Sequence, residues 1–345
     1  MAPIKTNNPV ASYFDFFSRS GTDAVGAAPP GIPPVEASGG NINGVTPGNG
    51  YKYHVFTGNG NFVVTQGGAV EILLVGGGGP SGTTDASSNV GTNAGGGGGG
   101  VVHAPAYTIG SGTHPIVIGD PAPQPLTPGT DRGVDSTFVD ANGPTTITAL
   151  GGGEGNSYNR NSGVGYPGGS GGGGGYPGAP GGDGLQPSQN PGISGLLQYG
   201  NAGGRAYYPE GGNYMYGGGG GSGAVGQPGD GPGAPAPGTA GAGGAGNAFP
   251  GFPGALPGFA PLPSAWKTAV APQGYFAGGG GGGREGSPPT QPGGVGGGGA
   301  ADATGTTGVT NTGGGAGGIN SPPSGPSAPV GKKGGSGIVI IRYQV

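Results

Sequence analysis

Three histidines, His54, His103 and His114, are the side chains of this sequence best suited to acid–base or metal chemistry. A metal site or a catalytic pair needs further His, Cys, Asp or Glu residues at ligand spacing, and the sequence places none beside them. Each histidine lies instead in a short stretch with the alternation of a β-strand. We therefore expect the histidines to be strand residues, and we predict no catalytic residue, no metal site and no cofactor.

Two glycine motifs have the letters of nucleotide-binding loops without the surroundings that such loops need. Residues 163–168 read GVGYPG and match the dinucleotide pattern GxGxxG, yet a chain with 98 glycines in 345 residues produces such matches by chance. No strand–turn–helix unit accompanies this match. Residues 331–333 (GKK) look like the end of a P-loop, but neither Ser nor Thr follows the lysine. Together these observations indicate that the protein is not an enzyme.

Tyrosine is the more informative residue type. Eight of the fourteen tyrosines fall within residues 158–216, where they are mixed with Gly, Ser and Asn. Antibody binding loops use this palette, because tyrosine gives a large contact area at a low cost in conformational entropy. The candidate contact residues are Tyr158, Tyr166, Tyr176, Tyr199, Tyr207, Tyr208, Tyr214 and Tyr216, with Trp266 and Phe276 as further candidates. The alternative, that these rings pack against glycine-rich segments, stays open for each of them.

Glycine and proline dominate the composition. A chain of this composition is either disordered or ordered by a dense network of backbone hydrogen bonds. The chain has 98 Gly and 38 Pro among 345 residues, while Leu, Ile, Val and Phe together number only 55. Both values are typical of disordered chains. However, charged residues make up 8% and the net charge is −4, so little self-repulsion expands the chain. Only eight of the 45 Leu, Ile and Val residues lie within 151–269, which predicts ordered ends around a core-poor middle.

Several further classes of protein are excluded by the first residues, the cysteine count and the charge. The chain contains no cysteine, so neither disulfides nor thiolate metal sites can stabilise it. The first residues include no apolar stretch long enough for a signal peptide, and no run of about 18 apolar residues predicts a membrane span. With 11 Lys+Arg and a pI near 5.2, nonspecific binding of nucleic acid is not expected. We expect a protein completed in the cytoplasm, without membrane insertion and without a nucleic-acid partner.

A two-residue period of apolar side chains begins at Tyr51 and marks a series of short strands. The strand candidates are residues 51–56, 61–65, 69–75, 101–106, 114–119, 135–140, 145–150 and 337–343. The sequence TGNG at 57–60 predicts that the first two strands form a hairpin. Residues 69–75 are apolar enough to be buried on both faces. Because Gly or Pro interrupts every longer window, we expect an all-β fold, a β-sandwich or jelly roll with almost no α-helix.

The last strand candidate decides the topology. Residues 337–343 read GIVIIRY and form the most β-prone window of the chain. An isolated strand is not stable, and adequate partners occur only before residue 150. We therefore predict four regions: an N-terminal attachment arm with a proline-rich linker (1–48), sandwich strands with the first glycine runs (49–150), a glycine-rich insertion with variable loops (151–330) and a closing strand (331–345).

The glycine runs supply a way to order the long insertion. They are residues 76–79, 95–100, 151–153, 171–175, 217–221, 278–283, 296–299 and 313–315. A polyglycine II helix is extended, with three residues per turn and a rise of about 3.1 Å per residue, so rods without side chains can pack closely and share N–H···O=C bonds. Ordering one residue's backbone costs about 1–2 kcal/mol and a hydrogen bond returns about 0.5–1.5 kcal/mol, so only a bundle can be stable. We predict that at least five of the eight runs form packed rods.

An aromatic cluster stands apart near the N-terminus. Tyr13, Phe14, Phe16 and Phe17 lie within five residues and are followed by prolines at 29, 30, 33 and 34. Such a cluster cannot form a core alone, and the proline-rich stretch is typical of a semi-rigid spacer. The cluster therefore predicts attachment to another protein. The alternative, that it folds back onto the chain's own sheet, stays open.

The order of these features resembles that of a known group of proteins. The blocks YxYxVFTGNGNF, VEILLVGGGG, GGGGGG, ITALGGG and GGSGIVIIRY follow one another over residues 49–345, and those at 70–79 and 334–343 are the most specific. This layout resembles the glycine-rich virion proteins of tailed bacteriophages, especially of cyanobacterial phages. It is also similar to phage tail-fibre adhesins and to the glycine-rich extracellular region of anaplastic lymphoma kinase, although that region has cysteines and less proline. The resemblance implies stacked polyglycine helices beneath variable receptor-binding loops.

Three functions are compatible with the resemblance and with the residues. The first is a virion structural protein, a tail-fibre or receptor-binding adhesin, joined to other virion proteins by residues 1–48 and facing a host surface glycan or protein through some of the tyrosines. The second is a capsid decoration or head-fibre protein without a specific receptor. The third is a filament-forming or ice-binding protein, for which residues 304–307 (TGTT) supply too short a repeated face. Association of identical copies stays open in all three.

Overall fold

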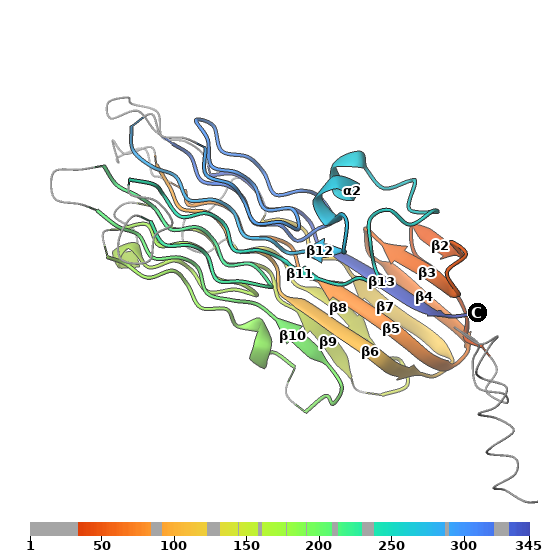
Figure 1. Cartoon of the computed structure of the whole chain (residues 1–345). Helices are drawn as coiled ribbons and strands as arrows, with labels where there is room; N and C mark the ends of the chain where they lie inside the picture. The colour runs from red at the N-terminus through yellow and green to blue at the C-terminus, as the bar shows by residue number, and fades with distance from the viewer. Residues whose placement is uncertain are drawn as a thin grey trace, which may run out of the picture.

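Two antiparallel sheets occupy one end of the molecule, and a bundle of long extended segments continues from them to the other end (Figure 1). The computed structural model describes residues 34–83, 92–122, 132–143, 145–157, 161–176, 178–190, 192–208, 213–229, 238–286, 290–320 and 331–345. Within these ranges, helix is limited to α2 (Ser264–Val270) and the 3-10 turns η1 (Asn161–Gly163) and η2 (Gln186–Ser188). The protein therefore belongs to the all-β class, as predicted.

The larger sheet has six strands in the order β10-β6-β5-β13-β3-β2. These strands are β2 (Ile42–Val45), β3 (Tyr51–Phe56), β5 (Gly68–Val75), β6 (Val101–Ile109), β10 (Leu197–Tyr199) and β13 (Ile338–Gln344). The C-terminal strand lies inside the sheet, because Ile340 pairs with Val55 of β3 on one side and with Leu73 of β5 on the other. This pairing confirms that the last strand returns to partners before residue 150.

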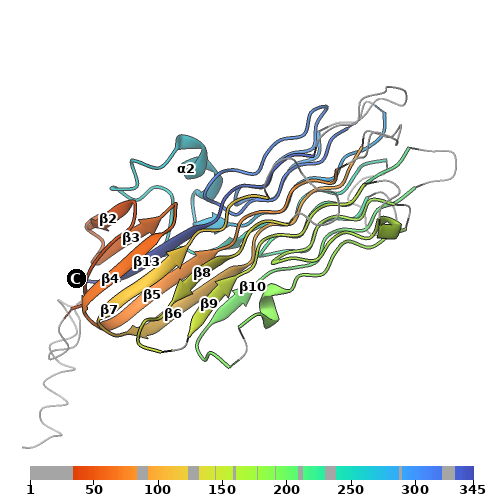
Figure 2. The ribbon, with the colours of Figure 1, turned by 180° about the vertical axis from the view of Figure 1, so that it is seen from behind.

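The smaller sheet has five strands in the order β1-β4-β7-β8-β9. These strands are β1 (Glu36–Ser38), β4 (Gly60–Gln66), β7 (Gly112–Val117), β8 (Ser136–Val139) and β9 (Thr146–Ala149). The two sheets face each other and enclose one hydrophobic core, and Figure 2 shows the same layers from behind. Its buried members include Phe62, Ile116 and Phe138 from the smaller sheet and Ile72, Leu74 and Val339 from the larger sheet.

Two local expectations from the sequence are wrong. β3 and β4 do not pair as a hairpin, because β3 belongs to the larger sheet and β4 to the smaller one. Residues 57–59 therefore form a corner between the layers, which lets Phe56 and Phe62 approach edge to face in the shared core, with ring centroids 6.5 Å apart. Residues 36–45, which the sequence assigns to the linker, contain β1 and β2 instead.

A third layer covers the outer face of the larger sheet. We call residues 247–276 the cap; it contains β11 (Asn247–Ala248), α2 and β12 (Tyr275–Phe276). The cap and the sheet share a second hydrophobic core, whose members include Phe252, Phe259 and Trp266 of the cap and Tyr53, Leu73 and Ile340 of the sheet. Because β5 is covered on both faces, its second half is buried at consecutive positions, as predicted for residues 69–75.

The bundle is held by backbone hydrogen bonds whose direction repeats every three residues. The N–H groups of Gly76, Gly79 and Gly82 donate to the carbonyls of Gly100, Gly97 and Ala94 in one neighbouring segment. The N–H groups of Gly78 and Ser81 donate to the carbonyls of Gly335 and Lys332 in another. A repeat of three residues is that of the polyglycine II helix.

The run at 95–100 shows how one rod contacts several others. Its N–H groups at 95 and 98 donate to residues 217 and 220, those at 96 and 99 to residues 316 and 313, and those at 97 and 100 to residues 153 and 150. The runs at 76–79, 95–100, 151–153, 171–175, 217–221, 278–283 and 313–315 are all joined to neighbours by such bonds. The prediction that at least five runs form packed rods is therefore confirmed.

The rods lie too close together for a side chain between them. A Cβ atom added at Gly97 would lie 2.2 Å from the carbonyl oxygen of Ser170, and one added at Gly219 would lie 1.9 Å from that of Gly96. Both separations are far shorter than van der Waals contact. At these positions glycine is required because two backbones approach each other closely.

Three glycine segments continue directly from strands of the larger sheet, all at the same end of these strands. β5 ends at Val75, β6 begins at Val101 and β13 begins at Ile338, and a glycine segment continues from each of these residues into the bundle. At the opposite end of the strands, Glu36 of β1 pairs with Gln66 of β4, and β13 ends at Gln344. The bundle thus also takes segments from before residue 151. We call the end of the molecule that contains the sheets and the first described residue, 34, the sheet end. The other end, formed by the rods, is the distal end (Figure 1).

Candidate functional site

Aromatic side chains gather near the distal end of the bundle. After β10 the chain runs away from the sheets through residues 200–208, which spans about 25 Å at roughly 3.1 Å per residue. It returns through residues 213–221 alongside, because Tyr207 and Met215 exchange both backbone hydrogen bonds, at 2.8 and 3.0 Å. This pairing brings Tyr208 and Tyr214 together, with stacked rings whose centroids are 4.5 Å apart.

A neighbouring turn, which carries Tyr176, is bonded to residues 205 and 206 of this segment. The N–H group of Gly178 donates to the carbonyl of Ala206 at 3.2 Å, and Arg205 Nε donates to the carbonyl of Gly178 at 2.8 Å. Tyr176 and Tyr207 are exposed, with 41% and 37% of the residue surface accessible. We define the distal cluster as Tyr176, Arg205, Tyr207, Tyr208 and Tyr214.

The distal cluster is fixed to the neighbouring rod at 278–286. The backbone N–H of Tyr214 donates to Glu285 Oε2 at 3.3 Å, and the backbone N–H of Glu285 donates to the carbonyl of Tyr214 at 3.0 Å. Aromatic faces, a guanidinium and a carboxylate therefore lie close together on a backbone held by hydrogen bonds. This combination can stack on an apolar face of a ligand and donate or accept hydrogen bonds at its rim.

Three of the candidate contact residues are packing residues instead. Trp266 and Phe276 are fully buried in the core between the cap and the larger sheet, where the Trp266 Nε1–H donates to the carbonyl of Asn311 at 2.7 Å. Tyr216 is 1% exposed, inside the rods. The prediction that these three side chains contact a partner is therefore wrong, because none of them reaches the surface.

The other candidates divide as follows. Tyr199 is half-buried and packs edge to face on Phe249 of the cap, with ring centroids 5.5 Å apart. Tyr166 is half-buried, and its carbonyl accepts the N–H of Gly172. The residues Tyr158, Tyr13, Phe14, Phe16 and Phe17 lie outside the described residues.

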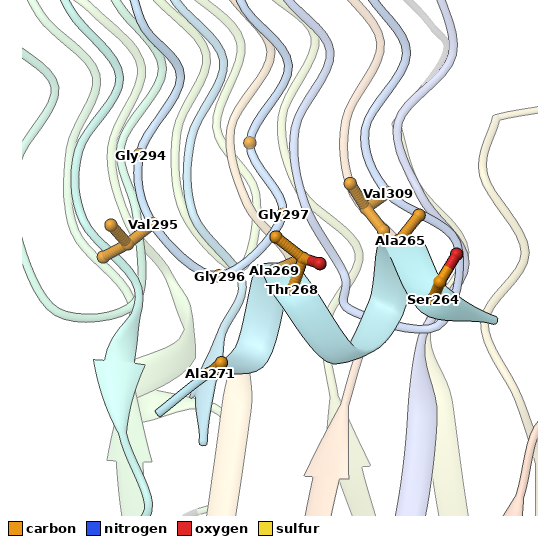
Figure 3. A pocket seen from close by; sticks show the side chains of 11 residues that line it. Ser264, Ala265, Thr268, Ala269, Ala271, Gly294, Val295, Gly296, Gly297 and Val309 are labelled. Atoms are coloured by element: carbon orange, nitrogen blue, oxygen red, sulfur yellow. The ribbon is translucent and has the colours of Figure 1, made fainter. Parts of the chain in front are cut away.

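A shallow groove lies between the cap and the bundle (Figure 3). Its volume is about 550 Å³, and α2 forms one wall while residues 294–298 and Val309 form the other. The lining consists of Gly, Ala, Ser, Thr and Val only. No charged or ring-bearing side chain lines it, and its only side-chain polar groups are the hydroxyls of Ser264 and Thr268.

The three histidines lie in β3, β6 and β7, as expected. The described residues contain no group of three or more His, Cys, Asp or Glu side chains placed to hold a metal ion. His114 is fully buried, 3.3 Å from Asp140 through its Nδ1 atom, and its ring stacks on Phe138. These contacts are typical of a core residue.

One charged cluster was missed by the sequence analysis. Arg342 of β13 binds Glu71 of β5 through Nε at 2.7 Å and donates from Nη1 to the carbonyl of Gly251 in the cap at 2.8 Å. His103 Nε2 lies 2.8 Å from the other Glu71 oxygen. Burial opposes the charge on Glu71, but the hydrogen bond from His103 and the charge and hydrogen bonds of Arg342 outweigh it and lower the pKa of Glu71. The cluster fastens the cap to the sheet.

The protein is thus of the all-β class, with a bundle of glycine-rich segments that extends from one end of two facing sheets. Residues 54–344 match the family model described as "Glycine-rich domain", and the chain belongs to this glycine-rich domain family. A search of curated proteins gives no match. No helix among the described residues is long and apolar enough to cross a membrane.

Proposed function

We propose that this protein is a structural component of a phage particle, a tail-fibre or receptor-binding adhesin whose distal cluster contacts a glycan or protein on the host surface. The observation that carries the proposal is the separation of the two ends. Residues 1–33 precede β1 at the sheet end, while the distal cluster lies at the far end of the rods. Such a molecule can be held by one end and can present the other.

The rods favour binding because they hold the aromatic rings in place before contact. Ordering flexible side chains or loops reduces affinity, so a preorganised surface binds more tightly. Aromatic anchors supply much of the energy of such contacts, and removal of a good one costs on the order of 2 kcal/mol, or about 30-fold in affinity. The resemblance to phage virion proteins supports the same role.

The test removes aromatic rings from the distal cluster in the assembled particle. We expect Tyr208→Ala with Tyr214→Ala, which removes the stacked pair, and Tyr207→Ala with Tyr176→Ala, which removes the exposed rings, to lower adsorption to host cells at least tenfold. Melting temperature should stay within a few degrees. Tyr275→Ala, which removes a half-buried tyrosine of the cap, is the matched control and should leave adsorption unchanged.

Two outcomes would contradict the adhesin proposal. Unchanged adsorption in both double variants would favour a capsid decoration or head-fibre protein without a receptor. A label on this chain that decorates the capsid rather than the tail tip would do the same.

Residues 1–33 are proposed to attach the protein to other virion proteins through Tyr13, Phe14, Phe16 and Phe17. Removal of residues 1–30 leaves β1 and β2 intact, so we expect a folded protein that no longer joins the particle. If the truncated protein unfolds, the aromatic cluster belongs to its own core instead. Co-sedimentation with particles, together with circular dichroism, separates these results.

A further inference from the structure

A buried chain of hydrogen bonds links the first described strands to the rest of the sheets. We call residues 36–45 the strap; it contains β1 and β2 and leads directly from residues 1–33. His54 of β3 is fully buried beneath it, with Nδ1 2.9 Å from the carbonyl oxygen of Gly39 and Nε2 3.1 Å from the hydroxyl oxygen of Tyr343. The strap is thus held at Gly39 by a histidine that is itself bonded to a tyrosine of β13.

The two groups bonded to His54 show which ring nitrogen carries the hydrogen. A carbonyl oxygen can only accept, so Nδ1 must carry the hydrogen that it donates to Gly39. In the neutral ring Nε2 then carries no hydrogen, and it accepts the hydrogen of the Tyr343 hydroxyl. Among the described residues, no other acceptor bonds to the Tyr343 hydroxyl. Every donor of the chain is satisfied only while His54 is neutral.

The surroundings of His54 disfavour its charged form. The ring of Phe62 meets it edge to face from β4, with centroids 5.1 Å apart, and Gly44 of β2 lies over it. The charged groups nearby are Lys52 on the same strand and Glu36 on β1, whose charge acts on Tyr343. No carboxylate forms an ion pair with His54 in the described part of the chain. Burial lowers the pKa of His54, the bond to Gly39 opposes this and Lys52 lowers it further.

We propose that His54 is an acid-sensitive latch for the strap: beneath the strap the charged ring is cut off from water, so protonation of His54 favours release of the strap from the sheets. A second hydrogen on Nε2 would face the Tyr343 hydroxyl, which would have to turn its own hydrogen into an apolar core. Few ladder bonds oppose movement of the strap, because β1 and β2 are short edge strands with irregular register. Its release changes the point from which residues 1–33 leave the molecule. This inference does not depend on a phage role.

The direction of the pH dependence follows from the lowered pKa. The folded, latched state binds its proton less readily than an open state with an ordinary histidine pKa of 6.5. The latch is therefore at full strength above pH 6.5 and weakens as the pH falls through 6.5 toward the folded pKa. Linkage limits the increase in strap opening to about 30-fold at pH 5.0.

Hydrogen exchange on the full chain tests the latch. We expect the protection factors of residues 36–45, corrected for the intrinsic pH dependence of exchange, to fall several-fold to 30-fold between pH 8.0 and 5.0 while those of β5 and β13 stay constant. His54→Gln can donate to Gly39 and accept from Tyr343 without titrating, so it should abolish this pH dependence. His114→Gln, which alters an equally buried histidine away from the strap, is the matched control and should preserve it.

Two results would overturn the proposal. One is a wild-type strap with equal protection at both pH values. The other is a pH dependence that persists in His54→Gln. Should that variant fail to fold, ¹⁵N NMR of the wild-type imidazole decides instead: the latch requires a neutral Nδ1–H tautomer at pH 7.5, and an Nε2–H tautomer would contradict it.

Discussion

The sheet end and the glycine bundle reach order through opposite chemistries. In the sheets, alternate side chains such as Ile72, Leu74 and Val339 leave water and fill a common core. In the bundle, the groups that interact are backbone N–H and C=O, which point toward different neighbours at successive residues. The two parts are therefore sensitive to different substitutions: the stability of the sheets depends on the volume of their side chains, and that of the bundle depends on the absence of side chains.

The largest expected effect comes from adding one carbon to the centre of the bundle. We expect Gly219→Ala to destabilise the protein by more than about 3 kcal/mol, because its Cβ would meet the backbone of Gly96, which has no flexible end to move aside. Gly58→Ala is the matched control in the sheet region, where no atom lies within 4 Å of the new carbon. Its change should stay within about 0.5 kcal/mol. Urea unfolding monitored by circular dichroism measures both, and equal effects would contradict a bundle held by close backbone approach.

Removing a large side chain tests whether the sheet end depends on the volume of its buried side chains. Trp266→Ala should cost about 3–5 kcal/mol, because it opens a cavity at the place where cap, larger sheet and bundle meet. Trp266→Phe keeps a ring in the core and should cost less, about 1–3 kcal/mol. Thermal unfolding gives both values. Comparable losses in the two variants would show that the hydrogen bond to Asn311, rather than the buried volume, carries the effect.

The smallest expected effect concerns the charged cluster that fastens the cap. Because Glu71 has a lowered pKa in the folded protein, its contribution to stability is fully present above the ordinary value of 4.5 and is lost as the pH falls through the folded pKa. Glu71→Gln should cost about 1–3 kcal/mol at pH 7 and should flatten the stability profile below pH 4.5. Denaturant midpoints between pH 7 and 3 measure this. A profile as steep as that of the wild type would assign the acid sensitivity to other carboxylates.

Strand positions could be predicted from the sequence because alternation is a local property. Residues 51–56 coincide with β3, and 69–75 and 337–343 lie within one residue of β5 and β13 at each end. Pairing could not be predicted in the same way. The TGNG segment favours a hairpin locally, but β3 finds its partner in β13, at the other end of the chain, and β4 is released to the second sheet.

The cap and the contact residues needed information that no short window contains. Phe252, Phe259 and Trp266 recur every seven residues, but the Pro and Gly residues between them exclude the continuous helix that this spacing would otherwise indicate, so the sequence alone did not show that they share a core. Tyr207 and Tyr216 each lie within three residues of another tyrosine and within four of a glycine pair, yet one is exposed and the other buried. On a three-fold rod, exposure depends on which neighbour each residue faces, and that phase is fixed only by the assembled bundle.

The three-residue repeat of the hydrogen bonds also sets a rule for how such molecules can change in size. Inserting one or two residues in a rod would turn every following N–H toward the wrong neighbour, whereas inserting three would restore each direction. One such turn would lengthen a rod by about 9 Å. Because adjacent rods share these bonds, they must grow together. Related chains are therefore expected to differ in reach by whole turns, with insertions in multiples of three matched between neighbouring rods.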